Sequence, residues 1–355
     1  MERDGVTYSS MSKFLNCRER FRLSQVEGWS SNNVSVPLEF GNLFHLYAEA
    51  QVHNFSEREM IRIGMKYADK RLANVADADT IADMQRLVAV SFVTFDEYTK
   101  YWQRVPSMSH GGADYFEGKF DWVAKEDQFD NTHKVPVLLS SREVRCRGKI
   151  DGVFRLNHKS PNLWVMENKT KGDIDVDGIK GGLNKDLQTG FYMLNVWKKY
   201  GRMPDGVLYN VIRRTGLRPR VSESASQFAD RVRGDIQSRP EWYFMRWKVE
   251  ITKQDLDDFQ NKMLNPILYQ MITWWDSVKK NPFAPHLLHD DDGNPLGPNP
   301  HHYERPFGCY DGMMHHQRGD YFEIIANGNY HQFHQRQFAF PELDSDLTAL
   351  DQYLE

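Results

Sequence analysis

The sequence predicts an α/β fold in which a mixed sheet is flanked by helices, with helical additions at the N-terminal and C-terminal ends. Two observations predict this fold. Apolar residues recur at helical spacing through the first hundred residues, and the pattern then changes to the short runs typical of strands. The expected order of the core is a helix, three strands, a helix and a fourth strand, which indicates a mixed sheet rather than a helical bundle.

The N-terminal region, residues 1–110, is expected to be helical. Serines that can cap a helix open the stretch 9–25, and a second helix is expected within 37–55. A third helix is expected from about residue 80 to residue 104, because its apolar side chains form one stripe. The loop 106–118 follows it.

The central region, residues 111–221, carries the expected sheet. Three strands are predicted, then a helix that ends at Gly201, then a fourth strand. In chain order, these elements cover residues 122–129, 144–156, 162–170, 185–201 and 206–214.

The C-terminal region, residues 222–355, is expected to add helices and loops that pack on the core. Thr252 and Asp255 resemble a capping box at the start of its longest helix. The expected elements are a helix at 222–238, a strand at 241–251, a helix from 252 to about 280, a strand at 321–326 and an acidic tail at 341–355.

Composition restricts the class of protein. The chain has 355 residues, of which 40% are hydrophobic and 26% charged, as in ordinary globular proteins. No apolar run reaches the roughly 18 residues of a membrane-spanning helix, and the charged start predicts no signal peptide. Cys17, Cys146 and Cys309 are far apart, which indicates a reducing cytoplasm. Because the net charge is -4, any binding of nucleic acid must depend on local basic patches.

Two carboxylates and a lysine form the candidate catalytic group. Asp151 lies near the end of one predicted strand and Glu167 near the end of the next, so both can reach one cation. Lys169 shares a strand face with Glu167, where its amine can position a water or offset charge. Asn168 points away and leaves its backbone carbonyl free as a ligand. Such a group suits phosphodiester hydrolysis, although an exposed charged strand is the alternative interpretation.

Two further patterns fall on predicted helices. Gln188 and Tyr192 are four residues apart and share a helix face, which suits contact with a phosphate and a base or sugar. The alternative is an amphipathic helix with Tyr192 in the core. His45 follows Gly41 by four residues, and a lone histidine is more often structural than a ligand.

The order of these patterns resembles the RecB-like branch of the PD-(D/E)XK nuclease superfamily. That branch carries G-x-x-x-H, G-x-x-D, E-x-K and Q-x-x-x-Y in this order, and this chain carries them from Gly41, Gly148, Glu167 and Gln188. The start SSMSKFLNCRERFRL is also similar to members of the branch, which include CRISPR-associated nucleases, and LYNVIRRTGLRP resembles segments of phage-encoded relatives. The resemblance spans roughly residues 8–215.

The resemblance implies a metal-dependent deoxyribonuclease. Asp151, Glu167 and Lys169 would be catalytic, and His45 would join Asp151, Glu167 and the Asn168 carbonyl in holding Mg²⁺ or Mn²⁺. Gln188 and Tyr192 would line the DNA channel. The enzyme would be exonuclease-like, acting on single strands or DNA ends in recombination, repair or phage DNA metabolism, in the cytoplasm of a bacterial or phage-infected cell.

Partners and alternatives follow from the same resemblance. Members of the branch often work beside a helicase or recombinase. Basic residues near the candidate site (Lys171, Arg213 and Arg214) could follow a phosphate backbone, or could belong to a solvated surface, because acidic residues lie in the same stretch. A catalytically silent protein that keeps the fold to bind DNA or act as a scaffold is the alternative function.

One feature of the branch is incomplete in this chain. Many members join their ends through an iron–sulfur cluster held by one N-terminal and three C-terminal cysteines. Cys17 corresponds to the first, but the C-terminal region contains only Cys309, so no iron–sulfur cluster is expected. Whether these two cysteines bind zinc together with nearby histidines stays open; those histidines are His301, His302, His315 and His316.

Overall fold

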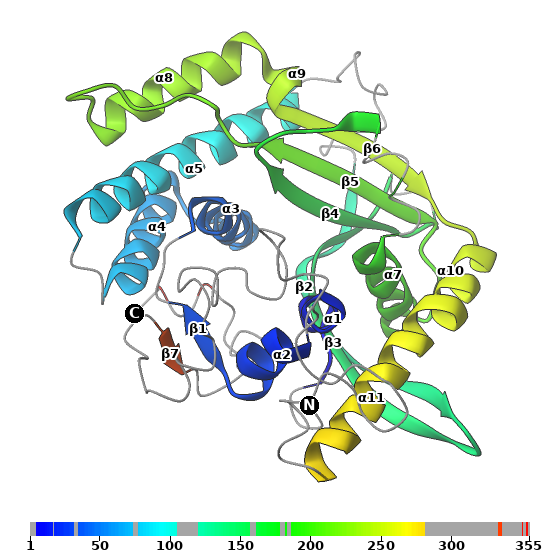
Figure 1. Ribbon diagram of the computed structural model, residues 1–355. Coiled ribbons are helices and arrows are strands. Elements are labelled where there is room, and N and C mark those ends of the chain that lie inside the picture. The colour runs from blue at the N-terminus through cyan, green and yellow to red at the C-terminus, as the bar shows by residue number, and fades with distance from the viewer. Residues whose placement is uncertain are drawn as a thin grey trace. The chain divides into compact units, whose positions relative to one another are not determined.

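A computed structural model gives the fold of most of the chain (Figure 1). It describes residues 5–16, 18–31, 35–73, 77–104, 120–156, 161–177, 182, 186–280, 333–335, 350 and 353. The loop expected at 106–118, the strand expected at 321–326 and nearly all of the acidic tail lie outside the described residues. Among the helices that are described, none is both long and apolar enough to cross a membrane.

The chain divides into two compact units, each assembled from segments far apart in sequence. Unit 1 consists of Met1–Asn33, Phe129–Gly148 and Asp257–Asp344, and unit 2 of Val34–Gln128, Lys149–Leu256 and Ser345–Glu355. Unit 2 contains every described residue of the candidate site.

A mixed sheet of five strands forms the centre of the fold. The strands are β2 (Asp121–Val137), β3 (Ser140–Arg155), β4 (Trp164–Lys171), β5 (Gly206–Arg213) and β6 (Phe244–Glu250), and they lie in the order β2-β3-β4-β5-β6. β4 and β5 are parallel, whereas β3–β4 and β5–β6 are antiparallel. β4 and β5 are buried over most of their length, which explains their nearly continuous apolar runs.

Helices of unit 2 flank this sheet. Helix α7 (Leu187–Tyr200) connects the parallel strands β4 and β5, as a parallel pair requires. Figure 1 shows the other long helices of the unit gathered together, and their buried residues form a large apolar core. These helices are α3 (Val36–Val52), α4 (Glu57–Leu72), α5 (Ala78–Arg104) and α8 (Ala225–Ser238). The expected mixed sheet flanked by helices is therefore confirmed.

Unit 1 has its own smaller core. The rings of Phe14, Phe21 and Trp274 pack edge to face in all three pairs, with centroids 5.4 to 5.8 Å apart, a preferred aromatic geometry. Besides the adjoining ends of β2 and β3, the described elements of this unit include α1 (Tyr8–Asn16), α2 (Arg18–Phe21), two π-helical turns (Arg22–Val26 and Gln260–Leu264), β1 (Trp29–Ser31), α11 (Asn265–Lys280) and β7 (Phe333–Gln335). β1 pairs with β7 antiparallel.

Some elements differ from those that the sequence predicts. Helix α4 was not expected, although Ser56 and Glu59 form a complete capping box at its start. Ser56 and Glu59 were therefore a usable signal of its start. The helix expected from 252 to 280 is interrupted by a π-helical turn (Gln260–Leu264) between α10 (Lys253–Phe259) and α11. A short helix, α9 (Pro240–Tyr243), replaces the start of the strand expected at 241–251.

Candidate active site

Strands β3 and β4 part at the candidate site. The last pair in their register is Gly152 opposite Met166. Asp151 and Glu167 are the neighbouring residues, just outside the paired stretch. Beyond that point the backbone N–H of Asn168 donates to Asp151 Oδ2 at 2.5 Å. An unpaired buried N–H group is costly. This bond gives the Asn168 N–H a partner where the β3–β4 hydrogen bonds stop, and it holds the Asp151 carboxylate against β4.

Glu167 and Lys169 share one face of β4, as strand alternation predicts. The two side chains form an ion pair, and Lys169 also donates to Gln188 Oε1 on α7. The Glu167 side chain is only 3% exposed, yet its Oε2 has no hydrogen-bond partner among the described residues. A buried carboxylate oxygen without a hydrogen bond is costly unless it binds a cation or accepts a bond from a donor.

The opposite face of β4 carries Asn168, which lies beside Asn210 of β5 in parallel register. Asn210 donates to Asn168 Oδ1 at 2.7 Å. Arg246 of β6 donates to Asn210 Oδ1 at 3.0 Å and to the Tyr98 hydroxyl of α5 at 2.7 Å. The Arg246 guanidinium also lies 3.9 Å from the centroid of the Trp102 ring. Buried polar networks of this kind are rigid when satisfied, so they fix the backbone on which the candidate site is built.

Helix α3 supplies His45. Its Nδ1 lies 3.3 Å from Asp151 Oδ1, and 36% of the side chain is exposed. Gly41, one turn earlier on the helix, faces β4, where a Cβ would lie 3.2 Å from Thr170 Oγ1. The glycine of the G-x-x-x-H pattern therefore permits the close approach of helix and strand that brings His45 to Asp151.

A carboxylate from β2, Glu126, reaches the same histidine. Glu126 Oε1 lies 3.9 Å from His45 Nδ1, and its Oε2 lies 3.2 Å from Lys149 Nζ. Lys149 also donates to Glu49 of α3 at 2.9 Å. The backbone of Glu126 is left-handed, with φ at 49°, which costs a residue other than glycine roughly 1 kcal/mol. Backbone strain of this kind is concentrated at functional sites.

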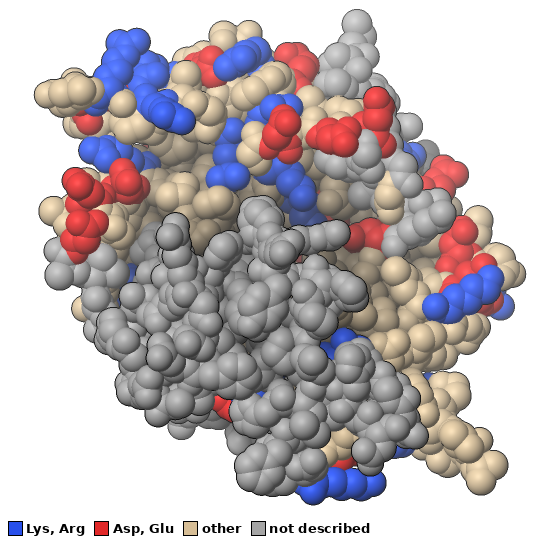
Figure 2. Space-filling model, in the orientation of Figure 1, with Lys and Arg blue, Asp and Glu red and all other residues tan. Residues whose placement is uncertain are grey.

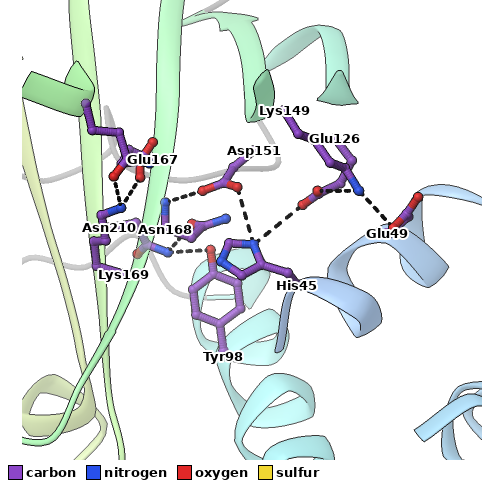
Figure 3. A network of polar contacts seen from close by, with 11 residues as sticks. His45, Glu49, Tyr98, Glu126, Lys149, Asp151, Glu167, Asn168, Lys169 and Asn210 are labelled. Atoms are coloured by element: carbon purple, nitrogen blue, oxygen red, sulfur yellow. Dashed lines mark hydrogen bonds and ion pairs between the residues drawn. The ribbon is translucent and has the colours of Figure 1, made fainter. Parts of the chain in front are cut away.

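His45, Glu126 and Asp151 converge from three elements (Figure 3). Each offers one ligand atom, and the three atoms lie within 4.8 Å of one another, so they could hold a metal ion. The two carboxylates supply the oxygen ligands that Mg²⁺ and Mn²⁺ prefer, and His45 adds a nitrogen ligand, which is more usual for zinc, copper, iron and nickel. Glu167 lies outside this group of three, and in the view of Figure 3 Asp151 stands between Glu167 and His45.

Electrostatics in the site follow from burial and from the crowded carboxylates. Burial raises the pKa of Glu167 to about 7, although Lys169 opposes the rise. Burial opposes the charge on His45, but Asp151 and Glu126 outweigh it and raise the pKa of His45 to about 10. Burial also opposes the charge on Lys169, yet the Glu167 carboxylate raises the pKa of Lys169 above its ordinary value. The carboxylates thus favour the charged form of His45, and Lys169 stays protonated.

The residues predicted to contact DNA have different surroundings. Arg213 pairs with Asp173 at 3.0 Å, and its guanidinium lies 4.1 Å from the centroid of the Trp242 ring. Lys171 is exposed. Tyr192 on α7 and Arg214 after β5 are half-buried. Gln188 is buried and bound to Lys169. Gln188 and Arg213 therefore already have partners within the protein.

The candidates for a metal cluster lie elsewhere in the chain. Cys17, Cys309, His301, His302, His315 and His316 are outside the described residues. Cys146 is described; it is buried, and its Sγ lies 3.8 Å from the backbone carbonyl oxygen of Val144.

Sequence reasoning missed Glu126, Lys149 and Glu49. Alternation along β2 could not assign the face of Glu126, because its left-handed backbone interrupts the regular strand. Glu49 carried a usable signal, since it lies four residues after His45 and so shares its helix face.

Comparison with known proteins supports the family. The model of the PD-(D/E)XK nuclease superfamily matches residues 6–271, about three quarters of the chain. No curated protein matches the sequence.

Proposed function

Since the chain belongs to the PD-(D/E)XK nuclease superfamily, we propose that it hydrolyses phosphodiester bonds of DNA with the help of Mg²⁺ or Mn²⁺. One observation carries this proposal: the carboxylates of Asp151 and Glu167 stand where β3 and β4 part, and Lys169 is fixed beside them. The superfamily suggests the nuclease activity; the three roles are our assignment.

The side chains present fit a divalent cation. Asp151, Glu167, His45 and the backbone carbonyl of Asn168 would hold it. Three of them offer the oxygen atoms that such ions prefer, and His45 offers a nitrogen. The buried, unpartnered Oε2 of Glu167 is an atom that a cation would satisfy. When bound, the cation would neutralise phosphate charge and make a water more acidic near neutral pH.

Lys169 suits charge stabilisation rather than proton abstraction. Its raised pKa keeps the amine protonated, so it cannot serve as a general base near neutral pH. A fixed ammonium can instead orient the attacking water or stabilise charge that develops on the phosphate. Gln188 holds this amine from the α7 side, so we assign it to positioning Lys169 as well as to the DNA channel.

DNA would approach the site along basic and aromatic side chains. Lys171, Arg214 and Tyr192 are the candidates with exposed or half-exposed side chains, and Arg213 would have to exchange its contact with Asp173 for a phosphate. On the face that Figure 2 shows, Lys and Arg side chains are interspersed with Asp and Glu. Binding would therefore be local and sensitive to salt.

The kind of cleavage, the partner and the cellular location are proposed from the RecB-like resemblance alone. We propose an exonuclease-like activity on single strands or DNA ends, in recombination, repair or phage DNA metabolism. A helicase or recombinase would be the natural partner, because such enzymes produce or use single strands. A cytoplasmic location in a bacterial or phage-infected cell belongs to the same proposal.

End-labelled single-stranded and double-stranded DNA, incubated with Mg²⁺, Mn²⁺ or EDTA, tests the activity. The expected result is metal-dependent cleavage that Lys169→Ala abolishes while DNA binding persists. Ladders from the labelled end distinguish exonuclease from endonuclease products. DNA binding without cleavage in either metal would instead favour the silent, scaffolding alternative.

A further inference from the structure

The candidate site contains one carboxylate that the superfamily pattern does not use. Glu126 of β2 has a side chain that is 6% exposed, and its two oxygens differ. Oε2 lies 3.2 Å from Lys149 Nζ. Oε1 lies 3.9 Å from His45 Nδ1, beyond hydrogen-bonding distance, and has no hydrogen-bond partner among the described residues. One oxygen is therefore satisfied, and the other faces the histidine without a hydrogen bond.

The surroundings of this oxygen have the dimensions of a cation site. One ligand atom each from His45, Glu126 and Asp151 lies within 4.8 Å of the other two. Ligands bound to one ion at 2.0 to 2.2 Å can be no more than about 4.4 Å apart, when they face each other across it. A small inward movement of side chains would therefore be enough to complete such a site.

Charge around the group also favours a divalent cation. When His45 is neutral, as a metal ligand must be, four carboxylates stand against two ammonium groups among the described residues of this network, which leaves an excess of two negative charges. The carboxylates are Glu49, Glu126, Asp151 and Glu167, and the ammonium groups belong to Lys149 and Lys169. Buried charges are stable only when they are paired or bound to metal.

From these observations we propose that Glu126 is a metal ligand. It would bind a divalent cation through Oε1 together with His45 Nδ1 and Asp151 Oδ1, while Lys149 holds its other oxygen. Asp151 would then present one carboxylate oxygen to this cation and keep the other on the Asn168 N–H. This inference rests on the proposed metal-dependent function and adds to it a ligand from β2.

Mn²⁺ binding measured by calorimetry and by electron paramagnetic resonance tests the proposal without reference to activity. Glu126→Gln keeps the size of the side chain and removes its charge. It should weaken Mn²⁺ affinity by about 10- to 100-fold or more and reduce the rise in melting temperature that Mn²⁺ produces. Glu49→Gln is the matched control, because it removes a buried carboxylate from the same Lys149 network but outside the ligand group. It should change the affinity by less than about threefold.

The outcomes separate the two proposals. If the wild-type chain binds no Mn²⁺, the metal-dependent function itself fails. If the wild-type chain binds Mn²⁺ and Glu126→Gln binds it equally well, or if both variants weaken it equally, Glu126 is not a ligand and the function can still stand. Should Glu126→Gln not fold, Glu126→Asp replaces it. That variant keeps the charge but withdraws the oxygens by about 1.5 Å, so wild-type affinity in it would overturn ligation.

Discussion

The backbone N–H of Asn168 donates to Asp151 Oδ2 at 2.5 Å, where the ladder between β3 and β4 has ended. The Asp151 side chain therefore accepts the N–H bond that a backbone carbonyl of β3 would accept if the ladder continued. The bond fixes one oxygen of Asp151 and leaves the other, Oδ1, facing His45 at 3.3 Å. Because β3 and β4 separate at this point, the carboxylates of Asp151 and Glu167 can form a candidate site.

Asp151→Asn tests this arrangement. The amide keeps the shape of the carboxylate and can still accept the bond from Asn168, so the fold should persist. Its charge is lost, so Mn²⁺ affinity and metal-dependent cleavage should each fall by about 10²-fold or more. Asp173→Asn is the control, because its side chain is 93% exposed and lies outside the ligand group, where it pairs with Arg213 and accepts from the backbone N–H of Ile174. Calorimetric affinity equal to wild type in Asp151→Asn would remove Asp151 from the ligand set.

Lys169→Met should act on chemistry rather than on metal binding. The methionine keeps the length of the side chain and removes the ammonium that pairs with Glu167. We expect kcat to fall by about 10²- to 10³-fold, with DNA affinity almost unchanged. Lys171→Met, two residues along the same strand and exposed, should instead weaken DNA binding and leave kcat near wild type. Single-turnover cleavage and a salt series of DNA affinity distinguish the two, and equal kcat losses would contradict the assignment.

Gln188→Leu distinguishes positioning from direct contact with DNA. Gln188 is buried and accepts a bond from Lys169. If it orients that amine, kcat should fall by about tenfold or more while the affinity for DNA stays within about threefold. The resemblance to the RecB-like branch predicts the opposite emphasis, namely a loss of DNA affinity. Measurement of kcat and KM separately decides which role dominates.

Part of the candidate site could be proposed from the sequence because strand periodicity is local. Asp151, Glu167 and Lys169 follow from two neighbouring strands, and the ion pair of Glu167 with Lys169 agrees with their predicted shared face. Glu126 depends on a left-handed residue within β2, and no alternation rule anticipates such a residue. The fold was predictable for the same reason; helix α4 was missed although Ser56 and Glu59 form a capping box at its start.

The buried network behind β4 predicts a large effect on stability. Asn210 donates to Asn168 and to the Tyr98 hydroxyl and accepts from Arg246. Asn210→Leu keeps the branched shape of the side chain but removes one partner from each of these groups, including the guanidinium of Arg246, a residue that is 2% exposed. The free energy of unfolding should fall by about 2 to 4 kcal/mol, as measured by urea denaturation. A change below about 0.5 kcal/mol would mean that the network is not important for stability.

Glu223 predicts an acid-sensitive contribution to stability. Its carboxylate accepts from Arg231 Nε at 2.8 Å and Nη2 at 2.7 Å, and from the backbone N–H of Arg220 at 2.7 Å. The bond with Arg231 lowers the pKa of Glu223 to about 2, below the value of about 4.3 in an unfolded chain.

Because the folded pKa is the lower one, Glu223 stabilises the fold fully above about pH 4.3 and loses this effect as the pH falls toward 2. The difference in unfolding free energy between wild type and Glu223→Gln should therefore be constant from pH 7 to about 5 and should narrow by pH 3. Urea denaturation of both proteins across this range provides the measurement. A difference that stays unchanged down to pH 3 would show that the pair with Arg231 does not hold Glu223 in its charged form.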